Sequence, residues 1–175
     1  MMVQKKEKHS VDTPYDTKCM FEHACAFFDC AKSCEIEPNN IEYRMHSHTV
    51  SGIVNSAFSC EIFLKTLLVF NGKKSHGHEL KVLWNDFKKS DRETALLIEQ
   101  RIQNWFNSKN DNLFNELLNE SSDAFEYWRY IYEKQNAKIN INFLIGLRTV
   151  LRETCCNKLF QMTWEEYKNR RNKYV

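Results

Sequence analysis

Turn-forming residues are scarce in this chain, and their scarcity constrains its fold more than any other feature. The 175 residues include only four glycines and two prolines. Sandwiches and barrels need such residues at their many chain reversals. A hydrophobic fraction of 42% is enough to bury a large core and excludes intrinsic disorder. Together these features predict an all-α helical bundle.

Length and hydrophobic pattern indicate one domain with a tail at each end. We expect a flexible tail at residues 1–16, a helical domain at residues 17–162 and a basic tail at residues 163–175. No apolar stretch follows the lysine-rich start, so we expect no signal peptide. Lys65 interrupts the most apolar run, which predicts no membrane span and a cytoplasmic location.

Apolar residues recur at helical spacing in successive segments. We expect five or six helices, over residues 17–34, 41–70, 79–87, 91–106, 112–131 and 139–160. Asn71 and Gly72 should end the second helix. Ser90 and Glu93 resemble a capping box for the fourth, and residues 121–123 are placed to interrupt the fifth.

Seven cysteines form an odd set without a secretory signal, which favours free thiols over a disulfide framework. Cys30 and Cys34 lie one helical turn apart and offer a metal site together with His23 or His46. No C-x-x-C pair supports such a site. We therefore expect no metal and no cofactor.

Glu61 is a charged residue in an apolar setting. Its helical neighbours four and three residues before it and three and seven residues after it are apolar: Ala57, Phe58, Leu64 and Leu68. Lys65 follows one turn later, in the favourable order for an ion pair. Either the two form a partly exposed surface pair, or Glu61 is an ionic group at the rim of a pocket.

Aromatic and charged residues are also concentrated at residues 124–133. Arg129 has Phe125 one turn before it and Tyr132 and Glu133 one turn after it. A guanidinium in that setting stacks on rings and still offers its planar edge to an anion. If Glu61 faces Arg129, the pair is structural. If it does not, Arg129 is available to a ligand.

His78 immediately precedes the third expected helix. Backbone N–H groups at a helix N-terminus favour anions, so His78 is a candidate anion contact. The alternative is that residues 76–78 form only a turn that orients the helix.

Three segments together resemble the bacterial HEPN domains (higher eukaryotes and prokaryotes nucleotide-binding). They read AFSCEIFLKTLL at residues 57–68, GHELKVL at residues 77–83 and FEYWRYIYE at residues 125–133. The family's corresponding patterns are E-x-x-L-K-x-L-L, G-H-x-L-x-x-L and, in one branch, W-R-Y-x-Y-E. The resemblance covers residues 50–133 and implies an all-α bundle and a homodimer. It also implies an antitoxin or nucleotidyltransferase partner, in toxin–antitoxin or defence systems.

The chain departs from the pattern of the HEPN nucleases. Many members of the family are metal-independent RNases that use an R-x4-6-H motif on a late helix. Here all six histidines precede residue 79, and no arginine has a histidine at that spacing. Arg44 and His48 come closest, on an early helix. The pair that would move a proton and stabilise developing charge is missing.

The sequence thus predicts a non-catalytic, dimeric HEPN-like module that binds a nucleotide, RNA or another anion and has no membrane partner. The expected ligand-binding residues are Glu61, Lys65, His78, Arg129, Tyr130, Tyr132 and Glu133. Arg129 and His78 would contact the anion, and Glu61 would position Arg129.

Two alternatives remain open. The first is a metal-independent RNase toxin with a rearranged site, using Arg44 and His48, or His78 of one protomer and Arg129 of the other. In the second, the motifs only stabilise the bundle and the basic segment at residues 168–175 docks onto a partner.

Overall fold

A computed structural model describes residues 15–35, 45–74, 76–133 and 138–172, without the side chains of residues 45–48. The described residues form helices and connecting loops, with no strand. The elements are α1 (Thr17–Ser33), α2 (Met45–Phe70), α3 (Leu80–Ser90), α4 (Arg92–Trp105), α5 (Leu113–Glu120), α6 (Ala124–Arg129), the 3-10 turn η1 (Ile131–Glu133), α7 (Ile141–Phe160) and α8 (Trp164–Arg171). The predicted all-α bundle is confirmed, with more and shorter helices than expected.

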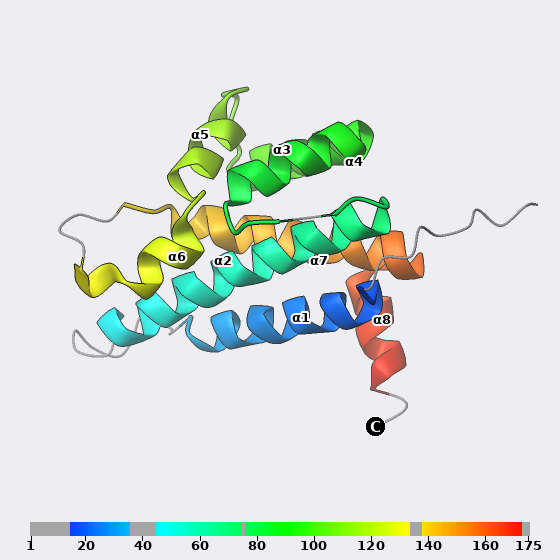
Figure 1. Cartoon of the computed structure of the whole chain (residues 1–175), viewed down its shortest axis with the longest axis horizontal. Coiled ribbons are helices and arrows are strands. Elements are labelled where there is room, and N and C mark those ends of the chain that lie inside the picture. The colour runs from blue at the N-terminus through cyan, green and yellow to red at the C-terminus, as the bar shows by residue number, and fades with distance from the viewer. Residues whose placement is uncertain (1–14, 36–44, 75, 134–137, 173–175) are drawn as a thin grey trace, which may run out of the picture.

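Helix α2 runs through the middle of the bundle (Figure 1). It contacts α1, α3, α6 and α7. Helix α1 lies antiparallel along one side of α2, and α6 lies near the first turns of α2 (Figure 1). The segments that carry Glu61 and Arg129 are therefore neighbours, although they are far apart in sequence.

The enclosure of α2 accounts for its apolar composition. Residues 49–70 are long and apolar enough to cross a membrane by length and composition, which corrects the prediction that no segment would be. In the structure, 67% of the apolar window in this segment is buried inside the bundle. The side chains it buries are mostly apolar, including Ile53, Ala57, Phe63, Leu64 and Leu67.

The predicted end of α2 is confirmed, but the predicted start of α4 is wrong in detail. Gly72 adopts a φ of 70°, in the left-handed region that favours glycine at a helix end. Asp91, rather than Ser90, caps α4: its carboxylate accepts hydrogen bonds from Thr94 N at 3.1 Å and Thr94 Oγ1 at 2.7 Å. The Ser90 hydroxyl instead donates to the Phe87 carbonyl within α3.

The interruption expected at residues 121–123 is present and separates α5 from α6. Ser122 in this break holds the start of α3. The Leu80 N–H donates to the Ser122 carbonyl at 2.9 Å, and the Lys81 N–H donates to its hydroxyl at 3.3 Å. The break thus fixes the start of α3 against the turn between α5 and α6.

The expected basic tail is different in the structure, where residues 164–171 form α8. A capping box between Thr163 and Glu166 starts this helix. Its side chains reach α1, because Tyr167 donates to Glu22 and Arg171 pairs with the same carboxylate at 2.6 Å. The N-terminal tail predicted at residues 1–16 lies outside the described residues up to residue 14.

All seven cysteines are free thiols, as predicted. Burial raises the pKa of the Cys25 thiol to about 12, so this thiol is not a ready nucleophile. Within the described part of the chain, no group of three or more His, Cys, Asp or Glu side chains is arranged to hold a metal ion. The side chain of His46, named as a candidate ligand, lies outside that part.

We predict that Asp91→Ala lowers the free energy of unfolding by about 1–2 kcal/mol, the usual cost of losing a helix cap. Asp91→Ser also loses the 2.9 Å ion pair with Lys158. Because it keeps a capping oxygen, it should lower the free energy of unfolding by less than Asp91→Ala does. Urea unfolding of both variants measures the difference. Equal losses would contradict the capping role.

The contribution of Asp91 should also depend on pH. Partial burial raises the pKa of this carboxyl, but hydrogen bonds from Thr94 and Lys158 outweigh burial and leave the pKa below its ordinary value. A lowered folded-state pKa stabilises the protein above about pH 4, and this stability is lost as the pH falls through the folded-state pKa. The difference in free energy of unfolding between the wild type and Asp91→Asn should therefore become smaller as the pH falls from about 4 through the folded-state pKa of Asp91.

Candidate functional site

Glu61 is a buried carboxylate at the centre of α2, with 1% of its side chain exposed. Its Oε1 atom lies 2.8 Å from Lys65 Nζ and 2.9 Å from His78 Nδ1. Its Oε2 atom is buried and has no hydrogen-bond partner. The predicted pair with Lys65 is present, but Glu61 is sealed in the bundle rather than partly exposed.

Glu61, rather than a helix N-terminus, fixes the position of His78. The first N–H groups of α3 already donate to Ser122, so they do not form the anion site predicted beside His78. His78 remains 48% exposed while its Nδ1 contacts the buried carboxylate. The histidine therefore links the interior of the bundle to solvent.

The contact with Glu61 defines which nitrogen of His78 faces other molecules. A carboxylate accepts, so Nδ1–H donates to Glu61. Among the described residues, Nε2 has no hydrogen-bond partner. A neutral His78 thus presents an acceptor, and a protonated His78 presents a second donor.

Arg129 packs against aromatic rings and forms no contact with Glu61. Its guanidinium carbon lies 5.0 Å from the centre of the Phe125 ring and 5.3 Å from that of Tyr130. Its Nη2 donates to the Tyr130 hydroxyl at 3.3 Å. Glu61 is bonded to Lys65 and His78 instead, so it does not position Arg129 as the sequence predicted.

Phe125 brings His78 and Arg129 to one place. The His78 ring lies 5.8 Å from the Phe125 ring, which Arg129 also contacts. Phe125 stacks on Phe58 at 4.5 Å, and Phe58 meets Phe27 of α1. This aromatic row joins α1, α2 and α6 and supports both the imidazole of His78 and the guanidinium of Arg129.

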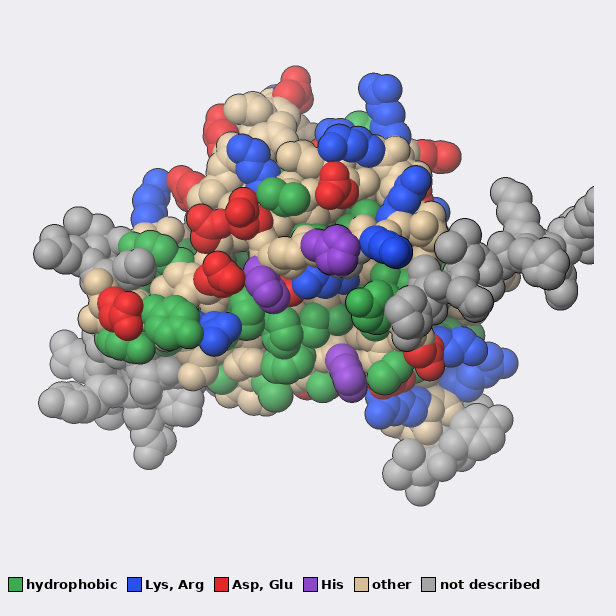
Figure 2. All heavy atoms as spheres, viewed as in Figure 1, with side chains coloured by type: hydrophobic (Ala, Val, Ile, Leu, Met, Phe, Trp, Pro, Cys, Tyr) green, Lys and Arg blue, Asp and Glu red, His purple; other side chains and the backbone are tan. Residues whose placement is uncertain are grey.

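The remaining predicted residues lie at the end of α6 and in η1. Tyr132 is 76% exposed, and its ring meets that of Tyr130 at 6.3 Å. Glu133 is also exposed, so its negative charge stands beside the two tyrosines. In Figure 2, histidine side chains and a strip of hydrophobic side chains share one face over α1 and α2, with hydrophobic and acidic side chains over α6 and η1.

We name the surface formed by the exposed His78, Arg129, Tyr130 and Tyr132 and the partly buried Phe125 the α6 face. Among the described residues, no carboxylate forms an ion pair with Arg129. The α6 face therefore offers a free guanidinium edge, an imidazole nitrogen and exposed rings. Phosphate and stacked bases are the ligands that suit those groups.

Sequence reasoning missed two arginines on α7, the buried Arg148 and the partly buried Arg152. Arg148 has 1% of its side chain exposed, and both it and Arg152 lie over the Phe28 ring, at 4.6 and 3.7 Å. Burial, together with the neighbouring charge of Arg152, lowers the pKa of Arg148 to about 10. The available signal was the place of Arg148 between Leu144 and Leu151 on the apolar stripe of the helix.

Comparison of the chain with protein-family models, with curated proteins and with solved structures found no match. The geometry of the α6 face and of the buried charges therefore carries the functional argument.

We predict that Glu61→Leu changes the free energy of unfolding by no more than about 1 kcal/mol, because replacing a buried ionic group by a well-packed apolar one is often neutral or stabilising. Glu61 Oε2 has no partner to lose, and the Lys65 and His78 side chains reach solvent. The His78 ring should become mobile, which NMR relaxation of that ring measures. A large loss of stability would show that Glu61 serves mainly to hold the fold.

Proposed function

We propose that this protein is a non-catalytic HEPN-like binding module, active as a homodimer, that binds a nucleotide or single-stranded RNA on the α6 face. The observation that carries the proposal is Arg129, an exposed guanidinium that rests on two aromatic rings and pairs with no described carboxylate. A structural arginine on a protein surface commonly has an acidic partner. This one is oriented by rings and left with donors to spare.

Each group of the α6 face has a role in such binding. Arg129 contacts a phosphate through its planar edge, and the Nε2 atom of His78 donates to the same ligand when protonated. Tyr132, as an exposed ring, stacks on a base. Glu61 holds His78 from below, and Lys65 pairs with the same carboxylate. Glu133 repels phosphates and limits where the chain of a nucleic acid can run.

The homodimer, the antitoxin or nucleotidyltransferase partner and the toxin–antitoxin or defence context enter the proposal through the family resemblance. Exposed Leu96 and Leu97, side by side on α4, support a self-association surface away from the α6 face. Analytical ultracentrifugation of the wild type and of Leu97→Lys tests it, because a charge at a dimer contact should release monomers.

We predict that Arg129→Ala weakens binding of a short fluorescein-labelled oligouridine about tenfold or more and lowers the salt dependence by about one phosphate contact. Tyr132→Ala should weaken it by a similar factor, since one base stack is worth about 1–3 kcal/mol. Arg101→Ala, an exposed arginine on α4, is the matched control and should bind as the wild type does.

Fluorescence anisotropy at several salt concentrations measures these effects, and uridine monophosphate in competition separates nucleotide from RNA binding. Unchanged binding by a folded Arg129→Ala protein would remove the proposal. An equal loss in Arg101→Ala would reduce it to non-specific charge attraction.

The hydrogen bond between Glu61 and His78 favours one second candidate, a metal-independent RNase. A carboxylate that holds Nδ1 leaves Nε2 to move a proton, and Arg129 beyond Phe125 could stabilise charge on a phosphate. The other predicted pair, Arg44 and His48, lies outside the described side chains.

The RNase candidate predicts cleavage of labelled RNA in EDTA by the wild type. His78→Ala should abolish it, whereas His76→Ala, an exposed histidine two residues away, should cleave normally. Binding without cleavage supports the module. Cleavage that survives His78→Ala would contradict both His78 as the base and this geometry.

A further inference from the structure

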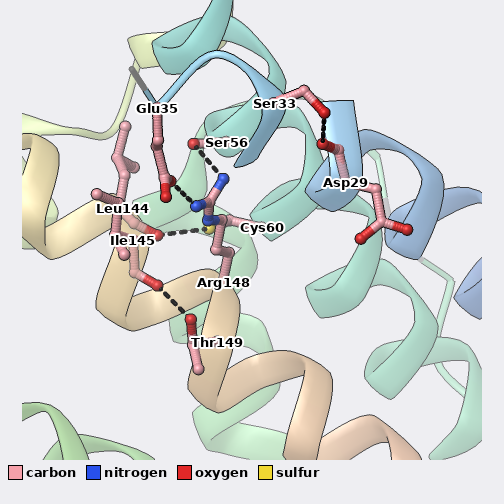
Figure 3. Close-up of polar contacts among 9 residues, drawn as sticks. All are labelled: Asp29, Ser33, Glu35, Ser56, Cys60, Leu144, Ile145, Arg148 and Thr149. Carbon is pink, nitrogen blue, oxygen red and sulfur yellow. Dashed lines mark hydrogen bonds and ion pairs between the residues drawn. The ribbon is translucent and has the colours of Figure 1, made fainter. Parts of the chain in front are cut away.

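Arg148 is a buried cation with an incomplete set of partners. Figure 3 shows its guanidinium between Glu35 and Ser56. Nη1 donates to Ser56 Oγ at 3.1 Å and Nη2 donates to the Glu35 carboxylate. Nε is buried and has no partner. The guanidinium therefore keeps a spare donor in a place where unpaired donors are costly.

The partners of Arg148 form one wall of a pocket. A pocket of about 240 Å³ lies between the end of α1, the first half of α2 and the start of α7. Glu35 and Ser56 line it on the polar side, and Ile53, Ile141 and Ile145 line it on the apolar side. Arg148 therefore lies directly behind the Glu35 and Ser56 side chains of a pocket whose other side is apolar.

Glu35 already occupies the anion position in this arrangement. It follows the last turn of α1 and is 39% exposed, whereas Arg148 is 1% exposed. The carboxylate of Glu35 can turn out to solvent at little cost, but the guanidinium of Arg148 cannot leave the interior. An incoming carboxylate would exchange with Glu35 without leaving Arg148 unpaired.

We propose that this pocket binds a small organic acid with an apolar body, whose carboxylate replaces that of Glu35 on Arg148. The body of the acid would lie against the three isoleucines. The volume suits such a ligand, because a dry cavity of about 150 Å³ already holds benzene. This site is separate from the α6 face, and the proposal does not depend on the function suggested for that face.

Burial of Arg148 supports a role beyond stability. A buried ion pair is weak evidence for stabilisation, because an apolar side chain of similar volume often does as well or better. Arg152, one turn later on the same ring, adds a second positive charge. Among the described residues, Glu35 is the one carboxylate that forms an ion pair with either guanidinium, whereas Asp29, Glu153 and Glu165 act on Arg152 from a greater distance.

Benzoate is the probe, with benzyl alcohol as its uncharged counterpart. Titration of the full chain, followed by NMR of the arginine Nε–H signals, should show saturable binding at about 1 mM or tighter and a shift of the Arg148 signal. Glu35→Gln removes the charge of the internal competitor and should tighten binding about tenfold. Glu120→Gln makes the same change in an exposed ion pair and should have no effect.

Two variants test the walls of the pocket. Arg148→Met should abolish binding, and Ile141→Trp, which places a large ring at an exposed position of the lining, should block it without touching the core. If Arg148→Met does not fold, binding of benzoate by Ile141→Trp and by Glu35→Gln tests the proposal instead. N-acetylphenylalanine, a mimic of a peptide end, should bind more weakly than benzoate.

The proposal is overturned if benzoate fails to saturate both wild type and Glu35→Gln, or if benzyl alcohol binds equally well. Binding that survives Ile141→Trp would place the acid elsewhere. Tighter binding of N-acetylphenylalanine than of benzoate would overturn the assignment to a small free acid and point to a chain terminus.

Discussion

The burial of α2 is the constraint on which the rest of this structure depends. Helices α1, α3, α6 and α7 all pack against it. A helix enclosed in this way must be apolar around most of its circumference, and α2 is so apolar that it has the composition of a membrane span. Any charge on it must find a partner inside the protein or reach out to solvent.

Glu61 meets this requirement through two partners that reach solvent, Lys65 and His78. Lys65 lies on the same helix, and His78 precedes α3, so one carboxylate oxygen joins α2 to the loop before α3. The histidine gains a fixed orientation and keeps one nitrogen in solvent. Arg148 is the mirror case on α7, a buried cation whose anion comes from the exposed Glu35. In both cases a sealed charge is paired with a group that solvent can reach.

Much of the fold was predictable because it rests on local rules. The scarcity of glycine and proline and the three-to-four spacing of apolar residues indicated an all-α bundle, and Asn71–Gly72 and residues 121–123 marked real breaks. Caps were less predictable, since Ser90 and Asp91 both suit a helix start. In the structure Asp91 accepts from Thr94 and also pairs with Lys158 across the bundle, a contact that the local sequence does not reveal. The segment after residue 163 was predicted to be a basic tail because most of its residues are charged or polar. In the structure it forms α8, whose Trp164 and Tyr167 rings pack on Phe21.

The candidate site was predictable only in part. The sequence marked Glu61, His78 and Arg129 as unusual, because each interrupts or borders an apolar stripe. The sequence paired Glu61 with Arg129. In the structure Arg129 packs on the Phe125 ring, which His78 also contacts, and the Glu61 carboxylate accepts a hydrogen bond from His78. Sequence reasoning also passed over Arg148, whose partners lie 92 and 113 positions away along the chain.

The sequence by itself determined the helical class, most helix limits and the free state of the thiols, because spacing, turn residues and the number of cysteines act locally. Only the tertiary structure decided which charges meet. A side chain on a helix selects its partner by how neighbouring helices are rotated and offset, and that geometry comes from packing the whole core at once.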